Sequence, residues 1–210
     1  MHSPTFTRFQ KGFSLLELVV SISVLLVLAG ITLGVTKTIT DTSRQTRCLS
    51  NLKQWAVAIH RYADDHQGRF PLSHPFDDGK AWYHFSSPLV QKYFLNDNMD
   101  PGTISRWNRG EEVNGCLQHT DRYASYAYSF HLGHVNAVGA SRFRGNRVLI
   151  QRPAHFLMIV DARVSPAASG FSNATPERIG KCHTQRFNAL YVDGHVESRR
   201  EIDPIEFFPE

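Results

Sequence analysis

The feature that most constrains this chain is an apolar segment near its start. Residues 13–35 contain one charged side chain, Glu17, and otherwise consist of apolar and small residues. As an α-helix, a segment of this length can cross a hydrocarbon core about 30 Å thick. An ordinary secretory signal has an apolar core of roughly 7–15 residues with its cleavage site after it. This longer segment is therefore predicted to be a membrane-spanning helix rather than an ordinary secretory signal.

Glu17 needs an explanation, because an acidic residue in the middle of a membrane helix costs roughly 2.5–3.5 kcal/mol. Before it stand the basic residues Arg8 and Lys11, then Gly12 and the aromatic Phe13. This junction resembles the class III signal of type IV prepilins and pseudopilins. The resemblance implies that prepilin peptidase cuts after Gly12 and methylates the new N-terminal Phe13. The alternative is an ordinary signal anchor that happens to contain a glutamate.

The same resemblance implies a topology and a set of partners. The leader, residues 1–12, stays cytoplasmic and is removed, while residues 13–36 form a single-pass inner-membrane helix that also serves as the filament core. The remaining chain lies in the periplasm or in a filament. Cleavage creates an ammonium group at Phe13 that Glu17 can pair with, in its own chain or in a neighbouring subunit. The implied partners are prepilin peptidase, other pilin or pseudopilin subunits, and the inner membrane.

The helical pattern continues beyond the apolar segment. Apolar and small residues recur every three or four positions up to about His66, which predicts an amphipathic continuation over residues 37–67. A helix from Ser14 to His66 is roughly 80 Å long. Within it, the spacing of Gly30 and Gly34 either lets two such helices approach closely or marks a weak point in the helix.

Residues 68–210 are predicted to form one globular domain. With the long helix this gives an α+β, pilin-like fold in which the N-terminal helix packs on a C-terminal antiparallel sheet. The segment at 187–200 is predicted to be a hairpin with Asp193-Gly194 as a two-residue turn. The other predicted elements are strands at 147–151 and 155–162, a short helix within 86–95, and loops at 96–122 and 165–180.

The C-terminal part supports a narrower resemblance. The segment 48–71 is similar to the one that follows the membrane helix in a large bacterial group of pilin-like proteins. The C-terminal signature of that group is a histidine, nine residues and Asp-Gly, matched here by His183, Asp193 and Gly194. The resemblance implies a filament-forming or filament-associated subunit, similar in architecture to type II secretion pseudopilins. Asp100-Pro101 departs from the Cys-Pro expected in many relatives, which puts a family disulfide at that position in doubt.

His183, Asp193 and His195 also invite a metal interpretation, since imidazole and carboxylate groups suit zinc. The structural alternative makes Asp193 the first residue of the turn and lets His183 hydrogen-bond the Asp193 carboxylate, which would brace the hairpin. Calcium requires an array of oxygen ligands, and Asp193, Glu197 and Asp203 supply some. The sequence therefore predicts no cofactor if these residues are structural. If they bind a metal, the predicted cofactor is a divalent ion such as calcium or zinc.

The three cysteines show no CxxC spacing, which argues against a zinc ribbon or a thioredoxin-like site. If the domain lies outside the cytoplasm, Cys116 and Cys182 are the predicted disulfide pair. The alternative is that these two and Cys48 are simply small buried residues.

The charge balance and motifs narrow the function classes. A formal net charge of +4 is too balanced for a dedicated nucleic-acid protein, and no catalytic motif such as G-x-S-x-G or H-E-x-x-H is present. The chain is therefore predicted to be no enzyme. The rival function is a minor pilin that binds DNA, a surface or secreted cargo. Arg142, Arg144 and Arg147 surround Phe143 and form either a phosphate-contacting loop or a solvated one.

Overall fold

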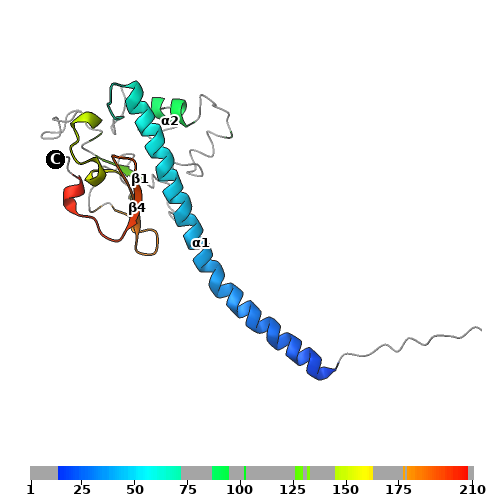
Figure 1. Cartoon of the computed structure of the whole chain (residues 1–210). Coiled ribbons are helices and arrows are strands. Elements are labelled where there is room, and N and C mark those ends of the chain that lie inside the picture. Colours follow the sequence, from blue (N-terminus) through cyan, green and yellow to red (C-terminus); the bar gives the residue numbers. More distant parts are fainter. Residues whose placement is uncertain are drawn as a thin grey trace, which may run out of the picture. The chain divides into compact units, whose positions relative to one another are not determined.

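The structure is a computed structural model of the chain, and it describes residues 14–71, 87–94, 102, 126–129, 132, 145–162, 177 and 179–207. The chain divides into an N-terminal unit, residues 1–40, and a head unit, residues 41–210. The long helix α1, Leu15–Asp65, contributes to both units (Figure 1).

The predicted long N-terminal helix is confirmed, and α1 ends one residue before the predicted His66. Gln67 and Gly68 leave the helix with positive φ angles of 58° and 79°. The Gly68 N–H donates to the Ala63 carbonyl at 2.7 Å. Such a bond satisfies a carbonyl of the last helical turn and stops the helix.

The head unit contains a four-stranded antiparallel sheet in the order β1-β2-β3-β4. Its strands are β1 Tyr126–Tyr128, β2 Leu157–Asp161, β3 Phe187–Tyr191 and β4 Val196–Arg199. Each strand pairs with its neighbour in sequence, so the sheet is a meander. The helix followed by this sheet is the α+β, pilin-like layout that the sequence predicts.

Two hydrophobic cores lie on the two faces of the sheet, and β3 contributes to both. Phe187, Ala189 and Tyr191 belong to one core, whereas Leu190 and Val192 belong to the core shared with α1. Alternation with a period of two is what a strand buried on both faces produces. The sheet is therefore covered on one face by α1 and on the other by the C-terminal chain.

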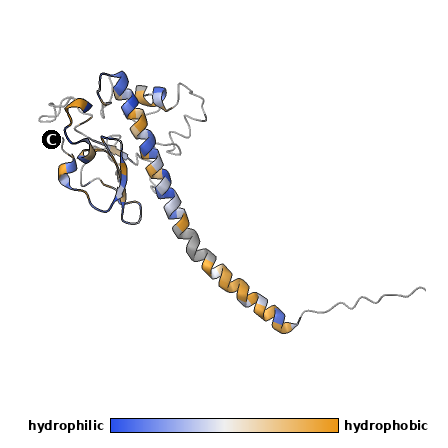
Figure 2. Cartoon of the chain, viewed as in Figure 1, coloured by the Kyte–Doolittle hydropathy of each residue, from blue (hydrophilic) through white to orange (hydrophobic). Residues whose placement is uncertain are grey.

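Helix α1 covers its face of the sheet with a buried stripe of Cys48, Leu52, Trp55, Ile59 and Ala63. These positions step by three or four residues, as expected for one face of a helix. The predicted periodicity of this region is therefore confirmed. In Figure 2 the head part of α1 alternates between hydrophilic and hydrophobic residues.

The short helix α2, Pro88–Tyr93, confirms the helix predicted within 86–95. Ser87 is its N-cap, and its hydroxyl accepts the Val90 N–H at 3.2 Å. The ring of Phe94 packs on Trp55 of α1 at a centroid distance of 4.3 Å. This contact fixes α2 against the helix.

The C-terminal chain closes the second core through the 3-10 turn η4, Pro204–Phe207. Phe207 enters the core, and the buried Glu206 carboxylate accepts the Tyr191 hydroxyl at 2.6 Å and Arg199 Nη1 at 2.7 Å. Burial raises the pKa of Tyr191, and its hydrogen bond to Glu206 raises that pKa further. The tyrosine therefore remains a neutral donor to the carboxylate.

The strand predicted at 147–151 is wrong. The segment forms the 3-10 turn η1, Arg147–Leu149, because the Asn146 side chain accepts the Val148 N–H at 3.1 Å. Val148 is 77% exposed, and no strand of the described residues pairs with this apolar run. Strand propensity is mainly a matter of packing on neighbouring strands.

The predicted C-terminal hairpin is confirmed, but its turn differs from the prediction. Gly194 N–H donates to the Tyr191 carbonyl at 2.9 Å, and Tyr191 N–H donates to the His195 carbonyl at 3.0 Å. The central residues are therefore Val192 and Asp193, and a positive φ occurs at Gly194 but not at Asp193. This is a three-residue connection with the glycine at a bulge rather than a two-residue turn.

Gly194→Val is expected to destabilise the head unit by more than about 1 kcal/mol, because a β-branched residue is poorly tolerated at positive φ. Gly194 has φ of 91°, while an added Cβ would meet the nearest His60 atom at an ordinary 3.6 Å. The cost is therefore one of backbone strain. Urea denaturation measures it, and Gly194→Asn is the control, since asparagine tolerates this conformation better. Equal stability of the valine variant and the natural protein would contradict the strain.

Candidate functional site

The first turn of α1 gives Glu17 a local partner. The Ser14 N–H donates to Glu17 Oε2 at 3.4 Å, and Glu17 is the acidic residue of the first helical turn. This is half of a capping box, in which a glutamate three residues into the helix satisfies the N-cap N–H. A carboxylate here also faces the positive end of the helix dipole. Gly12 and Phe13 lie outside the described residues.

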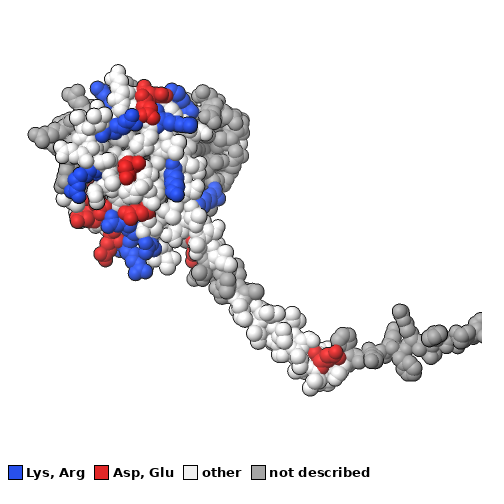
Figure 3. All heavy atoms as spheres, in the orientation of Figure 1, with Lys and Arg blue, Asp and Glu red and all other residues white. Residues whose placement is uncertain are grey.

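The α1 segment that follows is apolar on every side. Its two serines bond to the helix backbone, Ser21 Oγ to the Glu17 carbonyl at 2.7 Å and Ser23 Oγ to the Val20 carbonyl at 2.8 Å. Figure 2 shows this stretch as almost continuously hydrophobic, and Figure 3 shows little charge along it. The large exposed apolar residues are Leu15, Leu16, Leu18, Val19, Val20, Ile22, Val24, Leu25, Leu26, Val27, Leu28 and Ile31.

The helices in the described part of the chain include none that meets the combined length and hydropathy of a membrane span.

The comparison with protein families decides what this end of the chain is. A model of the prokaryotic N-terminal methylation motif matches residues 7–33, which include the Gly12-Phe13 junction and Glu17. This match supports a type IV pilin-like protein. The motif implies processing by prepilin peptidase and assembly with other pilin subunits. No curated protein and no solved structure matches the chain.

The fold of the chain agrees with the motif. A long N-terminal helix followed by an antiparallel sheet is the pilin-like layout. Type IV pilin-like proteins are a structural, non-enzymatic family, and the motif suggests a membrane-anchored or filament-associated protein.

The hairpin residues Asp193 and His195 pair with each other. His195 Nδ1 lies 2.6 Å from Asp193 Oδ1, and the His195 N–H donates to the same oxygen at 3.0 Å. Burial raises the pKa of Asp193, but the hydrogen bonds from His195 outweigh it and leave that pKa below its usual value. The His195 ring stacks on Tyr191 at 4.3 Å. These contacts hold the turn together without His183.

His183 lies at the opposite end of β3 from Asp193, and the predicted hydrogen bond between them is wrong. His183 Nε2 instead lies 3.2 Å from Asp161 Oδ2. The predicted metal set of His183, Asp193 and His195 is therefore not brought together. The reason is the order of the chain, because His183 precedes β3 and Asp193 follows it.

The predicted calcium ligands are engaged separately. Glu197 pairs with Arg199 at 3.5 Å, and Asp203 Oδ1 accepts the Ile205 N–H at 3.1 Å. Within the described residues, the group of three or more side chains able to hold a metal consists of Asp161, Cys182 and His183. Of these three residues, the sequence analysis proposes only His183 as a metal ligand.

Cys182 is a free thiol among the described residues, and the Cys116–Cys182 disulfide stays a prediction because only one of its two cysteines is described. Cys116 itself lies outside the described residues. The Cys182 Sγ contacts the Gly180 carbonyl at 3.3 Å.

The arginine loop of the DNA-binding alternative is only partly described. Arg147 Nη1 pairs with Asp64 Oδ1 at 2.6 Å, whereas Arg142 and Arg144 lie outside the described residues. On the visible face of the head unit, acidic and basic groups are mixed (Figure 3). The described residues therefore give this alternative no specific support.

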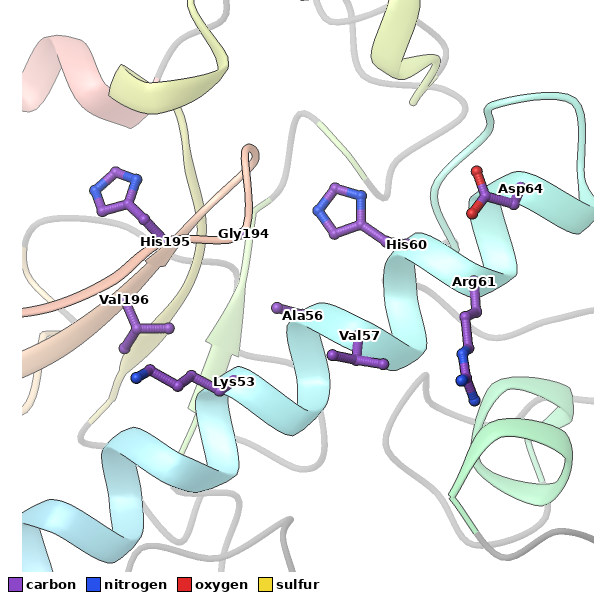
Figure 4. A pocket seen from close by; sticks show the side chains of 9 residues that line it. All are labelled: Lys53, Ala56, Val57, His60, Arg61, Asp64, Gly194, His195 and Val196. Atoms are coloured by element: carbon purple, nitrogen blue, oxygen red, sulfur yellow. The ribbon is translucent and has the colours of Figure 1, made fainter.

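An open groove of about 720 Å³ runs between α1 and the β3–β4 turn (Figure 4). Burial lowers the pKa of His60 there, and the nearby Arg147 lowers it further. No serine, threonine or cysteine is among its lining residues, so these offer no hydroxyl or thiol nucleophile. The lining residues are Lys53, Ala56, Val57, His60, Arg61, Asp64, Gly194, His195 and Val196.

Two residues of these sites escaped the sequence analysis although the sequence carries a signal for each. Ser14 stands three residues before Glu17, which is the spacing of a capping box. Asp161 follows the apolar residues 156–160, and an acidic residue at the end of a buried strand is worth noting because buried charges need partners.

Proposed function

We propose that this protein is a structural subunit of a type IV pilus-like or type II secretion pseudopilus-like filament. Prepilin peptidase cleaves it after Gly12 and methylates Phe13. The observation that carries the proposal is the match of the methylation motif over residues 7–33. In the proposed processing the bond after Gly12 is cut and the Phe13 amine is methylated, which leaves the apolar helix in the mature chain.

The exposed apolar side chains in the N-terminal part of α1 indicate that this part of the helix is surrounded by lipid or protein rather than by water. A helix that is hydrophobic all round is normally buried in a membrane or in a protein core. Residues 15–31 carry twelve large apolar side chains, each about half or more exposed. Covering them is worth on the order of ten kcal/mol or more, given roughly 1.5–3 kcal/mol for each side chain fully buried. Lipid covers them before assembly, and neighbouring helices cover them in the filament.

The proposed topology follows from the same processing. The leader, residues 1–12, is cytoplasmic, residues 13–36 span the inner membrane, and the amphipathic part at 37–67 leads to a periplasmic globular domain at 68–210. The space around Gly30 favours assembly, because a Cβ built there meets no heavy atom within 4 Å. A neighbouring helix can approach closely at that point.

We assign Glu17 to assembly and the C-terminal signature to the structure of the domain. Glu17 pairs with the ammonium group that cleavage creates at Phe13 of a neighbouring subunit. Gly194 supplies the positive φ of the hairpin, and Asp193 anchors His195 across the turn. His183 holds the chain before β3 against Asp161.

Intact mass and N-terminal sequencing of the membrane-extracted protein test the proposal. The expected chain starts at Phe13 and carries one added methyl group on its amine. A chain that starts at Met1, or one cut after Val35, would exclude prepilin processing. Expression without the peptidase is the control, and it is expected to give the full chain.

A further inference from the structure

Three potential metal ligands converge beside the sheet, far in sequence from the methylation motif. The ligand atoms of Asp161, Cys182 and His183 all lie within 4.8 Å of one another. Asp161 ends β2, whereas Cys182 and His183 belong to the segment just before β3. Each residue supplies a different donor: a carboxylate oxygen, a thiol sulfur and an imidazole nitrogen.

Backbone pairing fixes the positions of these donors. Gly180 N–H donates to the Asp161 carbonyl at 2.9 Å, and Ala162 bridges to Ile179. His183 and Arg186 exchange two hydrogen bonds of 3.0 Å, with positive φ at the two intervening residues. The segment therefore folds back on the end of β2, and its side chains are placed before any ion binds.

The carboxylate of Asp161 has an unused oxygen. Asp161 Oδ2 accepts the Asn188 N–H at 2.7 Å and faces His183 Nε2 at 3.2 Å. Among the described residues, the buried Asp161 Oδ1 has no hydrogen-bond partner, and the same holds for both amide atoms of the Asn188 side chain. Buried polar atoms normally have partners. The orphaned carboxylate oxygen indicates that something cationic belongs here.

We propose that Asp161, Cys182 and His183 bind one zinc ion. Thiolate, imidazole and carboxylate together are donors that suit zinc, which prefers four tetrahedral ligands. In a tetrahedral site, a nitrogen and an oxygen ligand that each lie about 2.0–2.1 Å from zinc are roughly 3.3 Å apart. This separation is close to the 3.2 Å between His183 Nε2 and Asp161 Oδ2. A solvent molecule completes the shell. The inference goes beyond the filament role and does not depend on it.

Zinc binding requires a defined protonation state of Cys182 and of His183. Cys182 binds as a thiolate, so its thiol proton leaves to solvent. His183 coordinates through Nε2 in its neutral form, and its proton resides on Nδ1. The ion ties the segment before β3 to the end of β2, which closes the connection between residues 161 and 182.

The test uses the purified full chain in detergent, reduced and freed of metal with a chelator. Zinc titration against a chromophoric chelator is expected to give one ion per chain and a higher melting temperature. Cobalt is the spectroscopic probe, because a thiolate ligand gives an intense near-ultraviolet band and tetrahedral geometry gives visible bands. Absence of stoichiometric zinc and of the thiolate band in the natural protein would overturn the proposal, whatever the variants do.

Conservative variants locate the site. Cys182→Ser is expected to abolish the cobalt–thiolate band and to weaken zinc binding at least about tenfold. Replacing a residue that only hydrogen-bonds to a metal ligand already costs about tenfold in affinity, so the loss of a ligand costs at least as much. Asp161→Asn is expected to weaken zinc binding while keeping the band. Cys48→Ser is the matched control, since it removes a buried thiol from α1. Unchanged binding by Cys182→Ser, or loss of binding in His195→Ala, would move the ion elsewhere and refute the assignment.

Discussion

Replacing Gly12 by valine is expected to leave the 12-residue leader on every chain. In the proposed processing, the peptidase must bring the bond between Gly12 and Phe13 into its catalytic centre. A branched side chain adds bulk beside the bond that is cut and stiffens the backbone there. The intact mass of membrane-extracted protein is expected to correspond to a chain starting at Met1, without the methyl group at Phe13.

Gly30→Val is the matched control for this variant. It makes the same substitution within α1, at a position where an added Cβ meets no heavy atom within 4 Å. We expect it to be cleaved and methylated normally. Chains of Gly12→Val that begin at Phe13 would contradict the assigned junction, and an uncleaved Gly30→Val would show that the helix rather than the junction controls cleavage.

The parts of the fold that the sequence predicts correctly are those determined by local chemistry. The end of α1 near His66 follows from a glycine at positive φ, and α2 follows from a Ser-Pro start in which Ser87 caps the helix. The β3–β4 hairpin follows from two apolar runs around an Asp-Gly pair. In each case the deciding residues lie within a few positions of one another.

The parts that the sequence misses depend on pairing between distant segments. The run at 147–151 has the composition of a strand, but within the described part of the chain no strand pairs with it, and its first residues form a 3-10 turn. Strand β1 has only three residues, all buried, so it shows no alternation that would reveal it. Strand propensity alone does not show that 147–151 is a turn or that 126–128 is a strand, because pairing with a neighbouring strand determines both outcomes.

The partner of His183 was missed for a related reason. A register shift between Leu157 and Ile159 places Leu157 opposite Tyr191 and Ile159 opposite Leu190, and the shifted register continues toward Asp161 at the end of β2. One residue of register changes which face a side chain occupies. Apolar periodicity places Asp161 near the end of a strand, but only the register shows that it meets His183.

Replacing Glu17 by glutamine is expected to abolish filament assembly while cleavage and membrane insertion continue. Glutamine keeps the length of the side chain and an oxygen that can accept the Ser14 N–H, as Glu17 Oε2 does at 3.4 Å. It lacks the charge that pairs with the Phe13 ammonium of a neighbour. Breaking a buried ion pair costs about 3–5 kcal/mol, which is more than about a hundredfold in an association constant.

Comparing Glu17→Leu with Glu17→Gln separates the pairing of Glu17 with a neighbouring subunit from its role in capping its own helix. A capping box accepts glutamate or glutamine at the third helical position, so Glu17→Gln retains the local role and Glu17→Leu removes it. If the charge sets the register between subunits, both variants fail to assemble. If capping is the purpose, the glutamine variant assembles like the natural protein and only the leucine variant fails.

Disulfide crosslinking in membranes distinguishes these outcomes. Cysteines introduced at Leu16 and Val20, which are 74% and 53% exposed on α1, report contact between neighbouring helices close to Glu17. With Glu17 present we expect strong crosslinks between subunits, and with either replacement we expect them to disappear while the intact mass still shows cleavage after Gly12. Crosslinks that persist in both variants would mean that the carboxylate does not set the register. The single acidic residue of the apolar segment would then serve only its own helix, through the bond to Ser14.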